Sequence, residues 1–221
     1  MQRKTWLELG HYCKENQLVL NTNSIYSYII VIAVLLTFLT NFGFSNLLEP
    51  FLFIKSDGSS FNPSFNNTYM ISHEWWRLIT PTFLHFSLTH LIFNCLWIYI
   101  LGSKIEELDG KGLLLFVFVT SSVVSNVAQF LWTQQILFGG LSGGVYGLLG
   151  YCFLIELDSK KERYDLPPAI YIFMIVWLLF GFLGVLEIFG FGSIANYAHL
   201  GGLISGLIFG MLTKLYLYKE K

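Results

Sequence analysis

The glycine-rich stretch at residues 138–147 contains the side chain best suited to covalent chemistry. Its sequence is Phe-Gly-Gly-Leu-Ser-Gly-Gly-Val-Tyr-Gly, so a single serine, Ser142, lies among five glycines directly before an apolar run. This order predicts a helix that begins near Ser142, where the first N–H groups have no partner within the helix and the helix dipole adds partial positive charge. Such a position can stabilise an oxyanion, and glycines such as Gly140 let other parts of the chain approach closely.

A serine hydroxyl is a weak nucleophile until a neighbouring base removes its proton, and the chain contains five histidines. His199 is the strongest candidate, because Gly202, Gly206 and Gly210 follow it at intervals of four residues and form one smooth helix face. Residues 143, 147 and 150 form a second glycine series directly after Ser142. Small residues at this spacing let two helices pack closely. The sequence therefore predicts a dyad of Ser142 and His199, with no evident acidic third member.

Two polar side chains in another apolar segment are expected to complete the site. His90 and Asn94 are four residues apart, so they share a helix face. Both donate hydrogen bonds, and with the Ser142 N–H they would line an oxyanion pocket, in which one donor changes the rate by about 100- to 1,000-fold. Tyr146 projects from the same face as Ser142, and we expect it to stack on the His199 imidazole and orient it.

A metal site is the main alternative for several histidines, and the spacing argues against it. His73 and Glu74 begin like a His-Glu-x-x-His zinc motif, but Arg77 occupies the position of the second histidine. His85 and His90 are five residues apart and do not share a helix face. We therefore expect no metal ion or other cofactor, and we expect His85 to form only a hydrogen bond to a backbone carbonyl.

The composition is typical of a helical membrane protein. The 221 residues are 54% hydrophobic and only 12% charged, about half the charged share of a soluble domain. Several apolar segments approach the roughly 20 residues needed to cross a bilayer. We predict an all-α bundle of six transmembrane helices, at residues 24–42, 82–101, 113–132, 142–157, 169–188 and 194–216. Residues 1–23 would form a short cytoplasmic segment, and residues 24–218 the membrane domain.

The segments between the predicted helices differ in character. The long connection at residues 43–81 is rich in aromatic side chains and is expected to lie at the membrane interface. A short charged turn is expected at residues 104–111. The predicted helix at 142–157 is too short to cross a hydrocarbon core of about 30 Å. Ser142 would therefore lie below the membrane surface, or the loop before it would dip inward, where protein or a water-filled cavity must cover it.

The distribution of basic residues predicts the orientation in the membrane. Six spans place both termini on one side, and that side holds eleven of the thirteen basic residues: Arg3, Lys4, Lys14, Lys104, Lys111, Lys160, Lys161, Arg163, Lys214, Lys219 and Lys221. Short cytoplasmic loops are enriched in Lys and Arg. Both termini are therefore expected in the cytoplasm, with the Ser142 loop and the start of the last helix facing outward.

Other features limit the remaining classes of function. The formal net charge of −1 and the lack of a nucleic-acid motif predict no nucleic-acid partner. Cys13, Cys95 and Cys152 lack metal-ligand spacing and are expected to be free thiols. Residues 1–22 are too polar for a signal peptide, so we expect the first apolar segment to be retained as a span.

At these residues the sequence resembles the rhomboid family of intramembrane serine proteases. Gly-Leu-Ser-Gly at residues 140–143 is similar to the family's Gly-x-Ser-Gly motif, and Ala198-His199 with the glycines after it is similar to the histidine motif of the last core helix. The other matching positions are His85, His90 and Asn94 in the pattern His-x4-His-x3-Asn, the pair Trp76-Arg77, and Gly102, Glu106 and Gly110. The resemblance covers about residues 24–212, in the six-span bacterial layout.

The resemblance implies an enzyme of a bacterial inner membrane that cleaves transmembrane segments of other membrane proteins without a cofactor. By position, the implied roles are Ser142 as nucleophile, His199 as general base and acid, His90 and Asn94 with the Ser142 N–H as oxyanion donors, and His85, Trp76, Arg77 and Glu106 as structural supports. Tyr197 stands where bacterial members often have a small residue, which leaves open the substrate side chain preferred by a pocket behind His199. The oligomeric state also stays open.

Two other classes of function are considered beside the protease. A non-catalytic rhomboid-like protein would bind transmembrane clients and guide their quality control, but such relatives usually lack the serine or the histidine. A small-molecule transporter would predict inverted repeats and paired broken helices, and the sequence shows neither. The substrates expected for the protease are single-span or multi-span membrane proteins.

Overall fold

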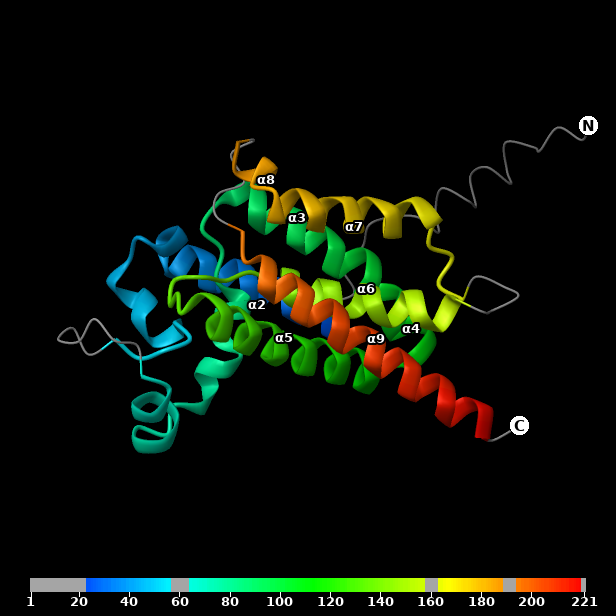
Figure 1. The fold of residues 1–221 in the computed structure, drawn as a ribbon, viewed down its shortest axis with the longest axis horizontal. Helices are drawn as coiled ribbons and strands as arrows, with labels where there is room; N and C mark the ends of the chain where they lie inside the picture. Colours follow the sequence, from blue (N-terminus) through cyan, green and yellow to red (C-terminus); the bar gives the residue numbers. More distant parts are fainter. Residues whose placement is uncertain (1–22, 57–63, 158–162, 189–193, 220–221) are drawn as a thin grey trace, which may run out of the picture.

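The protein is a bundle of helices that run roughly along one axis (Figure 1). The computed structural model describes residues 23–56, 64–157, 163–188 and 194–219, and these residues include no strand. The helices of the bundle are α2 (Ile25–Leu39), α3 (Leu88–Trp97), α4 (Ser103–Asp109), α5 (Lys111–Thr133), α6 (Ser142–Glu156), α7 (Pro168–Phe182), α8 (Val185–Ile188) and α9 (Asn196–Lys219). The predicted all-α class is confirmed, whereas the segment predicted at 1–23 lies, apart from Asn23, outside the described residues.

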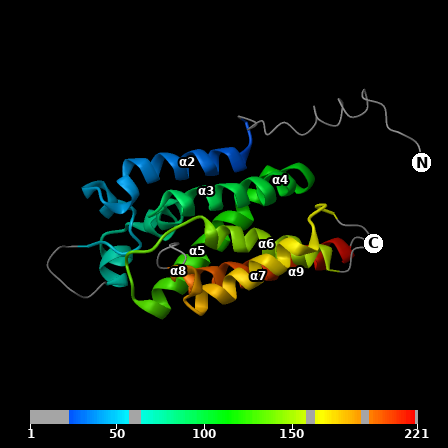
Figure 2. The same cartoon turned by 90° about the horizontal axis from the view of Figure 1, so that it is seen from above.

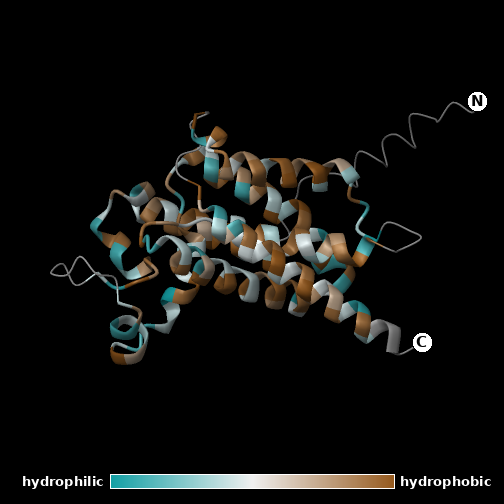
Figure 3. Cartoon of the chain, viewed as in Figure 1, coloured by the Kyte–Doolittle hydropathy of each residue, from teal (hydrophilic) through white to brown (hydrophobic). Residues whose placement is uncertain are grey.

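Apolar residues dominate the helices, and hydrophilic residues gather toward the ends of the bundle (Figure 3). Within the described ranges, three helical segments are long and apolar enough to cross a membrane: Leu88–Asp109, Lys111–Thr133 and Asn196–Tyr216. The helices α2, α6 and α7 have 15 residues each, and a helix of that length spans about 22 Å, less than a hydrocarbon core. Each predicted transmembrane segment thus contains a helix, while the number of six spans stays a prediction.

Helix α6 is the central element. It lies between α3 and α4 on one side and α7 and α9 on the other (Figure 2), and most of its side chains are buried. Helix α9 packs directly on it, because a Cβ atom added at Gly202 or Gly206 would overlap the backbone carbonyl of Gly143 or Gly147. The close contact of these two helices, predicted from the glycine spacing, is confirmed.

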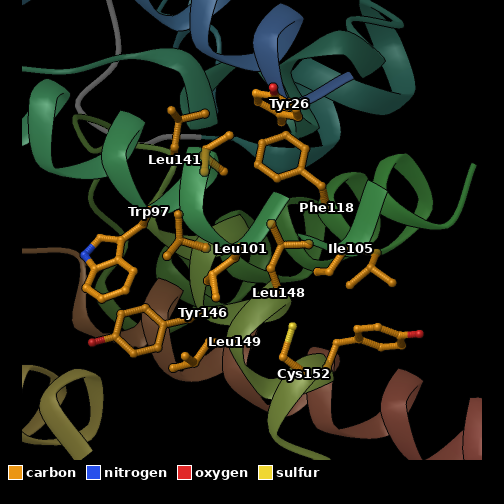
Figure 4. Close-up of a cluster of buried hydrophobic side chains, with 14 of the residues drawn as sticks. Tyr26, Trp97, Leu101, Ile105, Phe118, Leu141, Tyr146, Leu148, Leu149 and Cys152 are labelled. Atoms are coloured by element: carbon orange, nitrogen blue, oxygen red, sulfur yellow. The ribbon is translucent and has the colours of Figure 1, made fainter. Parts of the chain in front are cut away.

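The main core joins the first half of the bundle to α6. Side chains of α2, α3, α4, α5 and α6 meet in it, as Figure 4 shows for Tyr26, Phe118 and Leu148 among others. A partly buried polar contact fixes α2 in this assembly, since the Glu106 carboxylate accepts hydrogen bonds from the N–H groups of Ile25 (2.8 Å) and Tyr26 (3.2 Å). These N–H groups begin a helix and have no partner within it, so Glu106 of α4 caps α2.

The helix predicted at residues 82–101 has different limits in the structure. It begins only at Leu88, where the Ser87 side chain accepts a hydrogen bond from the His90 N–H at 3.2 Å and acts as an N-cap. At the other end a π-helical turn, η6 (Ile98–Gly102), leads into α4, and the helical chain stops at Gly110 with φ +94°. The charged turn predicted at 104–111 is therefore wrong, because no residue before Gly110 breaks the helix and the Glu106 side chain caps α2.

The helix predicted at residues 169–188 is also divided. Helix α7 ends at Phe182, Gly184 adopts a φ of +72°, and the short α8 follows. A positive φ is a conformation that glycine adopts readily, and it ends helices. The first predicted helix, at 24–42, ends at Leu39 instead, because Asn41 and Phe42 both have positive φ.

The described parts of the long first connection, residues 43–56 and 64–81, are built around a buried arginine. Arg77 donates through Nε to Glu74 at 2.6 Å and through its terminal nitrogens to Glu49 and to the carbonyl of Leu52. Glu74 also accepts a hydrogen bond from the Lys55 ammonium at 2.6 Å. The hydrogen bond from Lys55, with the added charge of Arg77, lowers the pKa of Glu74 below its ordinary value. Charge-assisted contacts of this kind hold the parts of the connection on either side of residues 57–63 together.

Candidate active site

The side chains of Ser142 and His199 meet where α6 and α9 begin. Ser142 is the first residue of α6, and His199 lies in the first turn of α9. The distance from Ser142 Oγ to His199 Nε2 is 2.8 Å, although the residues are 57 positions apart. At this distance the hydroxyl can pass its proton to the imidazole. The two helices reach this proximity because their glycine series remove the side chains that would separate them.

Tyr146 connects His199 to α7. Its ring stacks on the imidazole, with ring centroids 4.7 Å apart and an angle of 27° between the planes. Its hydroxyl donates a hydrogen bond to the backbone carbonyl of Met174 at 2.8 Å. The other imidazole nitrogen, Nδ1, has no hydrogen-bond partner in the described part of the chain. The orientation of His199 thus depends on stacking and on its place in α9.

His90 and Asn94 line the same cavity as Ser142. Both side chains come close to Gly140, which has a φ of +129°: a Cβ atom there would lie 2.7 Å from His90 Cε1 and 3.4 Å from Asn94 Nδ2. The amide nitrogen of Asn94 is buried and has no partner among the residues described. A buried donor without a partner is costly, so this amide is available to a group that enters the cavity.

His85 has a different place from the predicted one. It precedes α3 instead of lying in it, and its Nε2 accepts a hydrogen bond from the Leu141 N–H at 3.3 Å. Nδ1 of the neutral ring then carries the proton and points to Thr37 Oγ1 at 3.3 Å. The partner of Nε2 is a backbone N–H and not a carbonyl, so the prediction that His85 would bond only to a backbone carbonyl is wrong. His85 holds the residue before Ser142 and so fixes the start of α6.

The cavity beside Ser142 is small and is closed toward one side by aromatic rings. Its volume is about 30 Å³, which is room for about two water molecules. Phe93 of α3 stacks on Trp177 of α7 at a centroid distance of 4.9 Å, and Trp97 stacks on Phe173 at 6.1 Å. Water therefore fits beside Ser142 Oγ, whereas the cavity in this structure is too small for a peptide segment.

One polar contact near the site was not predicted. The Gln129 side chain of α5 accepts a hydrogen bond from the Ala198 N–H at 3.2 Å, directly before His199. Gln129 thereby positions the first turn of α9. The sequence offered one signal for this contact: Gln129 stands inside an apolar segment, where polar side chains are costly and usually have a function. Tyr197, in contrast, is not among the residues that line the cavity.

Comparison with known proteins identifies the family. The model of the rhomboid domain matches residues 72–215, well over half of the chain. The chain belongs to the rhomboid family. This range includes Ser142, His199, His90 and Asn94, so the whole cavity lies within the rhomboid domain.

Several bacterial rhomboid proteases are similar to this rhomboid domain. Rhomboid protease GlpG of Serratia proteamaculans is 42% identical over 135 residues, which cover 61% of this chain and 47% of the relative. GlpG of Pectobacterium atrosepticum is 40% identical over 135 residues, with the same shares. GlpG of Yersinia enterocolitica is 38% identical over 146 residues, covering 66% of this chain and 50% of the relative. The chain thus spans about half the length of the curated relatives it matches.

Proposed function

We propose that this membrane protein is an intramembrane serine endopeptidase, in which Ser142 and His199 form a catalytic dyad that cleaves transmembrane segments of other membrane proteins. The observation that carries the proposal is the 2.8 Å contact between Ser142 Oγ and His199 Nε2 in a cavity with unpartnered hydrogen-bond donors. The similarity to bacterial rhomboid proteases supports the same reaction class.

In the proposed reaction His199 Nε2 takes the proton of Ser142 while Oγ forms a bond to the carbonyl carbon of the substrate peptide. The carbonyl oxygen becomes an oxyanion, which the Asn94 amide, the His90 ring and the Ser142 N–H stabilise. His199 then gives its proton to the leaving amine as the C–N bond breaks. Water, activated in turn by His199, attacks the acyl-enzyme and releases the second product and the free serine.

The substrate is expected to enter sideways from the lipid, between α3 and α7. Only helix α7 separates the cavity from the surface of the bundle there. Met174 and Trp177 of α7 line the cavity, while Ile172 and Leu179 of the same helix are exposed. Substrate segments with small or helix-breaking residues are expected to unwind most easily and to fit the small cavity. A water-filled cavity also permits the irregular backbone of residues 138–141 at membrane depth.

Cleavage of a model substrate by purified protein in lipid vesicles tests the proposal. The protein should cut single-span substrates, with the cut positions mapped by mass spectrometry. Ser142→Ala and His199→Ala should each abolish cleavage. Ser122→Ala is the matched control, because this buried hydroxyl on α5 has no partner in the described structure and its loss should leave the rate within about twofold. Cleavage that persists in Ser142→Ala would rule the proposal out.

The second candidate is a rhomboid-like protein that binds transmembrane clients without cutting them. It is disfavoured because the serine and the histidine are both present and in contact. Labelling with a serine-directed fluorophosphonate separates the two. Labelling of Ser142 that His199→Ala prevents indicates an activated nucleophile, while client binding without labelling would favour the non-catalytic function.

A further inference from the structure

The proposed function has a transmembrane substrate enter between α3 and α7, so the attachments of helix α7 would decide how easily the substrate passes. Near its middle it is held by the hydrogen bond from Tyr146 to Met174 and by rings of α3. Its other face bears exposed apolar side chains such as Ile175 and Leu179. Helix α7 has far fewer neighbours in the bundle than α6 or α9. Single contacts at its ends therefore have a large share in fixing it.

The end of α7 nearest to the start of α9 is held by an aromatic contact with Tyr197. The ring of Tyr197 meets Phe182, the last residue of α7, edge-on at a centroid distance of 5.6 Å and an angle of 87°. Trp132 of α5 stacks on Tyr197, at 5.5 Å and 22°. Tyr197 thus has one neighbour on α7 and another on α5. We call these three rings the aromatic bracket.

Close backbone packing accompanies the aromatic bracket. Gly181 precedes Phe182 and lies so near the Asn196 side chain that a Cβ atom would overlap it. Phe182 and Trp132 are both partly exposed, with 45% and 70% of their surfaces accessible. The bracket is therefore outside the core, where contacts can open without unfolding the bundle.

We propose that Tyr197 is a positioning residue that holds the end of α7 against α9 and α5 and thereby limits how readily a transmembrane substrate reaches Ser142. The proposal rests on the proposed protease function. Tyr197 does not line the cavity, so it acts on access and not on the reacting atoms. Edge-on and stacked aromatic pairs stabilise their arrangement beyond simple burial. The pair with Phe182 holds α7 in the position seen in the structure, which we call closed, and the pair with Trp132 holds the Tyr197 ring in place.

The expected change in cleavage rate follows from the population of an open state, in which the end of α7 has moved away from α9 and α5. Loss of one aromatic pair changes an equilibrium by about 2- to 10-fold. Tyr197→Ala removes both pairs and should raise kcat/KM for a single-span substrate by about fivefold. Tyr197→Phe keeps both rings in contact and should behave like the unchanged protein. Trp132 is on α5, away from α7 and His199. Trp132→Ala should therefore also raise kcat/KM, but by a smaller factor than Tyr197→Ala.

Labelling by a small fluorophosphonate separates access from chemistry. The probe is far smaller than a transmembrane helix and needs a much smaller displacement of α7, so its labelling rate should rise far less than substrate cleavage in Tyr197→Ala, with an unchanged pH profile. Equal losses in substrate cleavage and in labelling would show that Tyr197 acts on His199 and would overturn the proposal. Unchanged substrate cleavage in Tyr197→Ala would overturn it as well. If Tyr197→Ala does not fold, Trp132→Ala and Phe182→Ala decide in the same way.

A distance measurement tests the bracket without relying on protease activity. Spin labels at Leu183, next to the end of α7, and at Leu137, after α5, occupy exposed positions. Tyr197→Ala should broaden this distance distribution and shift it to longer values, while a control pair at Leu137 and Ile71 should not change. If the unchanged protein cleaves no substrate, the proposed function fails. The distance measurement would still show whether Tyr197 holds the end of α7 in place. Identical distributions in both proteins would overturn the proposal.

Discussion

His199 is oriented without a carboxylate partner. Its Nδ1 has no hydrogen-bond partner among the described side chains and backbone groups, whereas in a triad an acidic group normally holds this nitrogen. Here Tyr146 covers one face of the imidazole at 4.7 Å, and the Gln129 side chain holds the turn of α9 that carries it. Aromatic stacking and a fixed backbone therefore replace the third member of a triad.

Substitution of Tyr146 separates these contributions at the residue scale. Tyr146→Phe keeps the ring on His199 and loses only the hydrogen bond to Met174, so kcat should fall by less than about fivefold. Tyr146→Ala removes the stack, and misplacement of a catalytic group by about 1 Å can lower the rate roughly 100-fold. Steady-state cleavage and circular dichroism of both variants check this. Equal activity of the two variants would contradict the stacking role.

Asn94→Ala tests the oxyanion donor. The amide nitrogen has no other partner in the part of the chain that the structure describes, so its loss should scarcely change stability. We expect kcat to fall by about 100- to 1,000-fold with little change in KM, because the donor acts on the transition state. Kinetics and thermal unfolding, measured side by side, distinguish this from a structural effect. A raised KM at constant kcat would instead indicate substrate binding.

At the element scale, the contact between α6 and α9 brings the dyad together. At Gly206 an added Cβ atom would meet the carbonyl of Gly147, whereas at Gly112 on α5 nothing lies within 4 Å. Backbone atoms cannot move aside as the end of a flexible side chain can. The two helices must therefore separate or tilt when a larger residue replaces Gly206.

Gly206→Val should accordingly destabilise the protein by about 1–3 kcal/mol and lower activity further by pulling His199 away from Ser142. Gly112→Ala is the matched control and should be neutral or stabilise by about 0.5–1 kcal/mol, as glycine is unfavourable within a helix. Unfolding in detergent and substrate cleavage measure the two effects. An active and stable Gly206→Val protein would contradict the predicted role of this contact.

On the scale of the whole molecule, acid should loosen the first connection before the bundle. The folded state lowers the pKa of Glu74 through hydrogen bonds and charges from Lys55 and Arg77. A carboxyl group with a lowered pKa adds stability at neutral pH, and this contribution starts to fall near its ordinary pKa of about 4.3 and is lost as the pH falls through the folded value.

We therefore expect limited proteolysis between residues 41 and 83 to accelerate below about pH 4.5 in the unchanged protein. Glu74→Gln should be cut faster already at pH 7, with a much weaker dependence on acid. Glu107→Gln, whose side chain lies on α4 at the other end of the bundle, serves as the control. A pH dependence that is the same in Glu74→Gln would contradict the role of this carboxylate.

The orientation of the whole molecule is also testable. The end of α2, which Phe44 follows, and helix α4, which contains Lys104, lie at opposite ends of the bundle (Figure 2). The basic side chains predict that the end with Phe44 faces outward. In a protein whose native cysteines are replaced, Phe44→Cys should react with a membrane-impermeant maleimide on intact cells. Lys104→Cys should react only after permeabilisation. The reverse pattern would invert the predicted topology.

The sequence by itself determined the helical class, the apolar segments and the pairing of Ser142 with His199. Periodic glycines and apolar runs indicate local helix geometry. A glycine series follows both Ser142 and His199, and this is enough to predict that the two helix faces pack together. The four-residue spacing of His90 and Asn94 predicted that they share a helix face and belong to the same site. These inferences required no knowledge of contacts between distant side chains.

Only the tertiary structure decided the helix limits, the partner of His85 and the direction of Tyr197. The chain stays helical through residue 109 because Glu106 is held by backbone N–H groups about 80 positions earlier, which no local pattern reveals. The Tyr197 ring likewise finds its neighbours on α5 and α7 instead of lining the cavity. Such contacts join segments far apart in the chain, and their geometry exists only once the helices are packed.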